Sequence, residues 1–247
     1  MTTTAKALQI LRLFKQGFKH VRAVDVETSL RVSPATAYRY LADLEETGLI
    51  ERTSVGQYVL GPEIVELDRL IRINDPLIDA ASEIMKALSE RTGGVVLLSR
   101  LHRRKVVCVH QVRGRHGPPL VSYERGRAMP LYRGATSRVI LAHMAPDDLR
   151  DLVRHDVAAL REAGLPNSFD TLVPLMAQIR RDKVCVTAGE VDAEACGWAA
   201  PIHQGELLLG SLSVVMWSQA PNINPQRVAD QVLRAALRIG GRLETPR

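Results

Sequence analysis

The chain has 247 residues, which is enough for two domains of ordinary size. Its 46% hydrophobic and 24% charged residues are typical of a globular protein and exclude a disordered or fibrous architecture. The formal net charge of +6, with an isoelectric point of about 9.5, favours an anionic partner without requiring one.

The three cysteines have no CxxC spacing, which argues against a disulfide framework and against a thiolate zinc site. The first residues contain no apolar signal core, and no apolar run approaches the roughly 20 residues that a membrane helix needs. We therefore expect a cytoplasmic protein with no membrane partner.

Two helices are predicted in the first thirty residues. Apolar residues recur at helical intervals from Ala5 to Phe18, in a stripe wide enough to face two surfaces, and Thr4 is expected to cap this helix. A second helix is predicted over Val24–Leu30, where β-branched residues lower the intrinsic propensity and packing has to hold the helix.

The third predicted helix has the clearest boundaries in the chain. Ser33 is a good N-cap, Pro34 fits the first helical position, and Gly48 can close the helix in the left-handed conformation. Its expected buried stripe is Ala37, Tyr40, Leu41 and Leu44. The side chains expected to point outward are Ala35, Thr36, Tyr38, Arg39 and Asp43.

That outward face suits a groove of DNA, because hydroxyl groups can bind phosphates or base edges and Arg39 can make a bidentate contact. The following residues, Leu49–Gly61, predict a hairpin that turns at Gly56, and a hairpin after such a helix is typical of a winged helix-turn-helix. An ordinary solvated face is the alternative for the helix alone. The residues expected to contact DNA are Ser33, Ala35, Thr36, Tyr38, Arg39, Arg52, Thr53, Ser54 and Gln57.

This segment resembles the DNA-binding half of the IclR-type transcriptional regulators. The resemblance is carried by Ser33-Pro34-x-Thr36-x-Tyr38-Arg39-Tyr40-Leu41-x-x-Leu44, then by Gly48-Leu49-Ile50, and then by Tyr58-x-Leu60-Gly61.

A helical linker is predicted next. Apolar residues follow helical intervals over Glu63–Ile73, and Asn74-Asp75-Pro76 interrupts the pattern before another helix that runs to about Arg91. In the family that the chain resembles, the linker and the first helix help to build a dimer. A homodimer, or a homotetramer, is thus expected to read a palindromic operator.

The rest of the chain predicts a mixed sheet flanked by helices, in an α+β domain. The expected strands are Val95–Arg100, Val106–Val112, Trp198–His203 and Leu207–Trp217. The expected helices are about Ser137–Met144, Pro146–Arg154, Thr171–Arg181 and Pro225–Gly240. The predicted organisation is a winged helix-turn-helix domain over residues 1–62, a helical linker over 63–76 and an effector-binding domain over 77–247.

Two stretches of this region extend the resemblance to the IclR effector domain, which has a GAF-like fold. They are Gly126–Ser137, and Ala199–Ile202 followed by Leu209–Val214. One departure is that family members often have histidine at the position of Tyr132 and lack Arg133, which points to a different ligand.

Alternation along Leu207–Trp217 predicts a pocket. It places Leu208, Leu212, Val214 and Met216 on one face, and the small residues Ser211 and Ser213 with Val215 on the other, although these serines could instead face solvent. Arg133 is a natural partner for a carboxylate, and Trp198 could stack on an aromatic effector or belong to the core. The residues expected to bind the effector are Met129, Leu131, Tyr132, Arg133, Gly134, Ala135, Glu190, Asp192, Trp198, Ser211 and Ser213.

No motif predicts catalysis, a cofactor or a metal, because HExxH, GxSxG, a Walker loop and GxGxxG are all absent and the histidines are isolated. The sequence predicts a regulator, repressor or activator, whose affinity for double-stranded operator DNA changes when a small organic acid binds. Non-specific binding to DNA is the main alternative, since residues 100–138 carry ten basic residues and one acidic residue. A small-molecule enzyme is the other.

Overall fold

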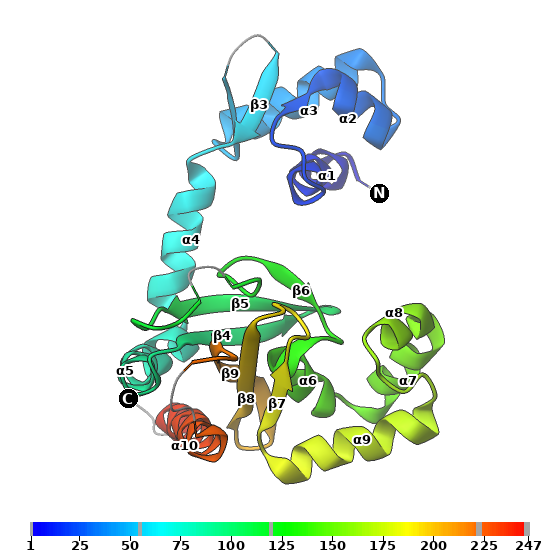
Figure 1. The fold of residues 1–247 in the computed structure, drawn as a ribbon. Coiled ribbons are helices and arrows are strands. Elements are labelled where there is room, and N and C mark those ends of the chain that lie inside the picture. Colours follow the sequence, from blue (N-terminus) through cyan, green and yellow to red (C-terminus); the bar gives the residue numbers. More distant parts are fainter. Residues whose placement is uncertain (1, 54–55, 119–120, 221–223, 245–247) are drawn as a thin grey trace. The chain divides into compact units, whose positions relative to one another are not determined.

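The computed structural model describes residues 2–53, 56–118, 121–220 and 224–244. The chain divides into two compact units, Met1–Asp75 and Pro76–Arg247 (Figure 1). Among these described residues, no hydrophobic core is shared between the units: the first unit has one core, and the second has one on each face of its sheet. In the ranges just given, no helix is long and apolar enough to cross a membrane.

The first unit is built from helices and a small antiparallel sheet in the order β1-β3-β2. Its elements are α1 (Thr3–Lys15), β1 (Val21–Arg22), α2 (Ala23–Leu30), α3 (Pro34–Glu46), β2 (Ile50–Arg52), β3 (Gln57–Leu60) and α4 (Glu63–Asn74). Apolar side chains from α1, α2, α3 and all three strands form one core, so α3 and the hairpin are held against each other.

Local sequence explains where these helices begin and end. The Ser33 hydroxyl accepts from the Thr36 amide at 3.4 Å, Pro34 is the first residue of α3, and Gly48 has φ +71°, as predicted. The predicted cap of α1 is wrong: the Thr2 hydroxyl accepts from the Ala5 amide at 3.3 Å, and Thr4 lies inside the helix. The helix also ends before Phe18, because Gly17 adopts φ +99°.

The second unit is a six-stranded sheet in the order β6-β5-β4-β9-β8-β7. Its elements are α5 (Pro76–Thr92), β4 (Val95–His102), β5 (Lys105–Val112), β6 (Ala128–Pro130), α6 (Gly134–Ala142), α7 (Pro146–His155), α8 (Val157–Glu162), α9 (Phe169–Asp182), β7 (Cys185–Ala188), β8 (Ala195–Gln204), β9 (Leu207–Trp217) and α10 (Pro225–Glu244).

Every described strand pair of this sheet is antiparallel, so the expected mixed sheet is wrong. Hairpins join β4 to β5 and β8 to β9, and the helices α6 to α9 carry the chain from the edge strand β6 to the opposite edge strand β7. None of these connections makes the crossover that would place two neighbouring strands in parallel.

Helices cover both faces of the sheet (Figure 1). Each face has its own hydrophobic core. Leu98 and Leu212 pack with α5 and α10, whereas Val95 and Leu97 pack with α6, α7 and α9. The strands buried on both faces therefore have long apolar runs instead of a simple alternation.

An irregularity in β9 decides which of its side chains share a face. Ile202 of β8 is paired with Gly210 and His203 with Leu208, so Leu209 is an extra residue on β9. Leu208 consequently packs on the α6 side and Leu209 on the α5–α10 side. The predicted grouping of Leu208 with Leu212, Val214 and Met216 is wrong for this reason. A Cβ on Gly210 would lie 2.1 Å from the Ser99 carbonyl oxygen, so only glycine fits there.

Candidate functional site

The predicted DNA-contacting face of α3 is open to solvent. Ser33, Ala35, Tyr38 and Arg39 are exposed and Thr36 is half-buried, while the opposite stripe is buried in the core of the unit. The Tyr38 side chain is 57% exposed, which is unusual for so large an aromatic residue. This face of α3 can therefore enter a groove without any rearrangement of the core.

The hairpin of β2 and β3 supplies the remaining predicted contacts. Arg52 and Thr53 are exposed and Gln57 is half-buried. The Thr53 amide donates to the Gln57 carbonyl at 3.1 Å, and Gly56 takes φ +71°. Ser54 lies outside the described residues. The hairpin thus presents a basic and a hydroxyl side chain from the same compact unit as α3.

A small cavity of about 30 Å³ adjoins the start of α6 in the second unit. It is lined by residues of α6, β7, β8 and β9, of the segment between β7 and β8 and of the segment before β6, among them Gly134, Ala135, Thr187, Glu190, Asp192 and Cys196. This volume accommodates about one water molecule, so a larger ligand requires its walls to move.

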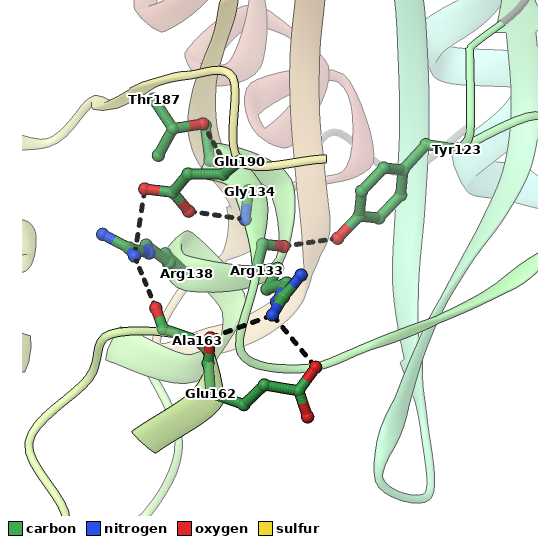
Figure 2. A network of polar contacts seen from close by, with 9 residues as sticks. Tyr123, Arg133, Gly134, Arg138, Glu162, Ala163, Thr187 and Glu190 are labelled. Carbon is green, nitrogen blue, oxygen red and sulfur yellow. Dashed lines mark hydrogen bonds and ion pairs between the residues drawn. The ribbon is translucent and has the colours of Figure 1, made fainter. Parts of the chain in front are cut away.

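Two side chains from the β7 region bind the first amides of α6 (Figure 2). The Gly134 amide donates to Oε2 of Glu190 at 3.0 Å, and the Ala135 amide donates to the Thr187 hydroxyl at 3.0 Å. A helix start leaves such amides without partners inside the helix and carries a partial positive charge. Gly134 has φ +79°, and a Cβ there would lie 2.8 Å from Val191, so glycine lets the segment approach.

Glu190 also pairs with a cation one helical turn further along α6. Its Oε1 atom lies 3.0 Å from Nη2 of Arg138, and the same guanidinium donates to the Ala163 carbonyl at 3.4 Å (Figure 2). Arg138 Nε is buried and has no hydrogen-bond partner among the residues that the structure describes. Both carboxylate oxygens of Glu190 are therefore occupied.

The second carboxylate of the cavity wall is bound differently. Asp192 accepts from the Ser122 amide at 3.0 Å and from the Ser122 hydroxyl at 2.5 Å. Its carboxylate therefore holds the segment before β6, and among the residues that the structure describes Glu190 is the carboxylate that binds the start of α6.

The predicted serines of β9 are buried, which excludes the alternative in which they face solvent. The Thr136 hydroxyl donates to Ser213 at 2.9 Å, and the Ser211 hydroxyl donates to the Thr136 carbonyl at 3.3 Å. These bonds fix α6 on the sheet.

Tyr123 holds the residue before α6. Its hydroxyl donates to the Arg133 carbonyl at 2.6 Å (Figure 2) and also contacts the Ser137 hydroxyl. Burial raises the pKa of Tyr123 to about 12, so the phenol keeps its proton at neutral pH and acts as a donor.

Several predicted pocket residues lie away from the cavity. The Arg133 guanidinium donates to the Glu162 carbonyl at 2.9 Å and to its carboxylate at 3.1 Å (Figure 2). The Tyr132 hydroxyl donates to Asp156, Leu131 is buried in the core on the α6 side, and Met129 lies in β6.

Trp198 is buried on the opposite face of the sheet, in the core with α5 and α10. Prediction from the sequence missed Thr187, Cys196 and Arg138 at the cavity or beside it. Arg138 could have been found from its spacing, because a residue four positions after Gly134 lies on the same face of the helix as the start of α6. Among the residues that the structure describes, no group of three or more His, Cys, Asp or Glu residues could hold a metal ion.

Family models match both units. The model described as IclR helix-turn-helix domain matches residues 3–54, and the model described as Bacterial transcriptional regulator IclR C-terminal matches residues 73–240.

Curated relatives and solved structures agree with these matches. The HTH-type transcriptional regulator XynR of Escherichia coli is 24% identical over 98% of this chain and 96% of its own length. The Glycerol operon regulatory protein of Streptomyces coelicolor is 29% identical, over 80% of this chain and 77% of its own length. The crystal structure of an IclR homolog complexed with 4-hydroxybenzoate, from Microbacterium hydrocarbonoxydans, superposes with a TM-score of 0.80 at 20% identity, and the match covers 98% of this chain and 99% of that one.

Regulators of this kind bind DNA through the helix-turn-helix, carry a separate effector-binding domain and are not enzymes. Because the two family models together span most of the sequence, the chain belongs to the IclR family of bacterial transcriptional regulators.

Proposed function

We propose that the protein is a homo-oligomeric, sequence-specific regulator that reads a palindromic operator with α3 and the hairpin β2–β3, and that a small organic acid changes its affinity for that operator. The observation that carries the proposal is the exposed face of α3, on which Tyr38 and Arg39 stand free of the core. Arginine on such a face can bind a guanine edge through two hydrogen bonds, which discriminates between bases.

An organic acid is the effector class that the start of α6 supports best. Backbone amides at a helix start attract anions, and the related protein from Microbacterium hydrocarbonoxydans was crystallised with the aromatic acid 4-hydroxybenzoate. In this chain, Gly134, Ala135, Glu190 and Asp192 line the cavity at which we expect such an acid to bind. The cavity has to enlarge first, because about 30 Å³ is far below the size of such a ligand.

A homo-oligomer is supported by α4, which we assign to the linker at residues 63–76. None of its side chains is buried, and five large apolar residues are exposed, namely Val65, Leu67, Leu70, Ile71 and Ile73. An apolar patch of this kind usually marks an interface between proteins.

The proposal is tested by selecting ligands for the full-length protein from a random duplex library and then measuring competition with unselected DNA. A regulator should enrich one inverted repeat and prefer it by at least about 10³-fold at physiological salt. Equal affinity for selected and random duplexes, with a steep salt dependence, would show non-specific binding instead.

The effector part is tested on the enriched duplex with 4-hydroxybenzoate and other small acids. At least one acid should change the apparent Kd for the operator, whereas the matching amide should not. Operator affinity that no acid changes would refute this part of the proposal.

A further inference from the structure

The carboxylate of Glu190 occupies the place where an anionic ligand would bind. Its two oxygens lie 3.0 Å from the Gly134 amide at the start of α6 and 3.0 Å from the Arg138 guanidinium on the next turn. An amide at a helix start together with an arginine is a strong combination of donors for a carboxylate. In this structure the chain's own side chain satisfies both (Figure 2).

The remaining charges leave no position for a second carboxylate beside Glu190. Asp192 is the other charged group on the cavity wall, and Arg138 is the one cation that pairs with either of these two carboxylates among the described contacts. Arg133, the cation expected here from the sequence, is bound to Glu162 instead. An added anion would therefore meet two negative charges and one cation that is already paired.

We propose that Glu190 is an internal ligand of the α6 start, and that an acid effector binds by exchanging with its side-chain carboxylate. This inference rests on the proposed function for the nature of the effector. In the exchange the incoming carboxylate takes the Gly134 amide and the Arg138 guanidinium, and Glu190 turns out towards solvent, where its side chain is already 27% exposed. Glu190 thus sets which acids bind, because only an acid with enough additional contacts can replace a carboxylate tethered at the site.

The exchange would also change contacts outside the cavity when the ligand binds. Arg138 holds the Ala163 carbonyl just after α8 at 3.4 Å, so a ligand that redirects this guanidinium changes the attachment of α8 to α6. The β7–β8 segment is released at the same time, because Glu190 is its charged contact with the helix start.

Replacing Glu190 by alanine provides a direct test, because acetate is equivalent to the CH₂–COO⁻ fragment that the substitution removes. The full-length Glu190→Ala protein should melt at a lower temperature than the unmodified protein. Acetate should raise that melting temperature saturably at constant ionic strength, since a ligand that binds only the folded form stabilises it. Acetamide, which has the same shape but no charge, should have no effect.

Asp192→Ala is the matched control, since it removes a carboxylate from the same cavity wall that does not contact α6. Neither this variant nor the unmodified protein should respond to acetate. A lack of response in Glu190→Ala, or an equal response in the control, in the unmodified protein or to acetamide, would overturn the proposal.

The variant Glu190→Gln keeps the proposal testable if the alanine protein does not fold. It retains an oxygen acceptor for the Gly134 amide but has no charge to compete with an acid. Calorimetry should then show acetate binding at least about tenfold more tightly than to the unmodified protein, and an unchanged affinity would refute the internal ligand.

These results can be separated from the fate of the proposed function. Acetate rescue combined with operator binding that no acid alters would leave Glu190 as an internal ligand and refute the acid effector. If acids alter operator binding but acetate does not stabilise Glu190→Ala, the acid effector would stand and the internal ligand would be refuted.

Discussion

Arg39 is the single residue from which the clearest effect on DNA binding is expected. It is exposed on α3, and its guanidinium lies 5.7 Å from the ring centre of Tyr40, which orients it along the helix surface. The substitution Arg39→Ala should weaken binding to the selected operator by about 1–3 kcal/mol if the side chain binds a base through two hydrogen bonds. Fluorescence anisotropy with labelled duplexes measures this loss.

Arg12→Ala is the charge-matched control, because Arg12 is also exposed and basic but lies on α1. Arg12→Ala should reduce the free energy of operator binding by less than Arg39→Ala does. A loss for Arg39→Ala that is equal on operator and random DNA, with a smaller salt dependence, would place Arg39 on a phosphate and contradict base reading.

At the residue scale, the sequence predicted the features that depend only on neighbouring residues, such as helix caps. The Ser33 cap and the left-handed Gly48 were predictable because a cap needs only the residues around it. The choice between Arg133 and Arg138 was not, because it depends on Glu162 and Glu190, which lie far away in sequence. The sequence also left open whether Trp198 faces the pocket or the core, because both faces of a strand can be apolar when both are buried.

At the scale of elements, α4 is expected to form the subunit interface. Leu70→Glu would place a carboxylate in an apolar contact, where it loses its hydration without gaining a partner. The variant should therefore lower the molar mass measured by light scattering after gel filtration. It should leave the helical circular dichroism signal unchanged.

Arg69→Glu controls for the added negative charge, because Arg69 is an exposed polar neighbour on the same helix. It should leave the mass unchanged. An unaltered mass for Leu70→Glu would remove α4 from the interface.

The long elements were predictable because their hydrophobic period extends over two or more turns or over both faces of a strand. The first edge strand β6 has 3 residues, β7 has 4 and α8 has 6, which is too short for a pattern to stand out, and all three were missed. The reversal of sides at Leu209 was also unpredictable, because a single extra residue in β9 is visible only in its pairing with β8.

For the whole molecule, binding of DNA and binding of an acid must affect each other equally. If an acid weakens operator binding by a given factor, the operator must weaken binding of that acid by the same factor. Calorimetric titration of the acid into free protein and into the protein–operator complex measures both affinities. Unequal factors would show that the acid acts at a site other than the folded regulator, for example on the DNA.

The division of the chain into two units follows from its hydrophobic pattern, whereas the pocket does not. Each core draws its residues from one continuous part of the sequence, residues 7–58 for one unit and residues 77–239 for the other. The cavity instead combines residues from 121 to 215, and its charges are set by pairs that only the folded sheet brings together.

The contacts at the start of α6 couple the local unfolding of this helix to that of a distant strand. The amides of Gly134 and Ala135 are held by side chains located 56 and 52 residues later: Thr187 lies on the edge strand β7, and Glu190 lies two residues after that strand. The first turn of α6 cannot be more stable than its attachment to that edge, so the turn and the edge strand β7 should fray together.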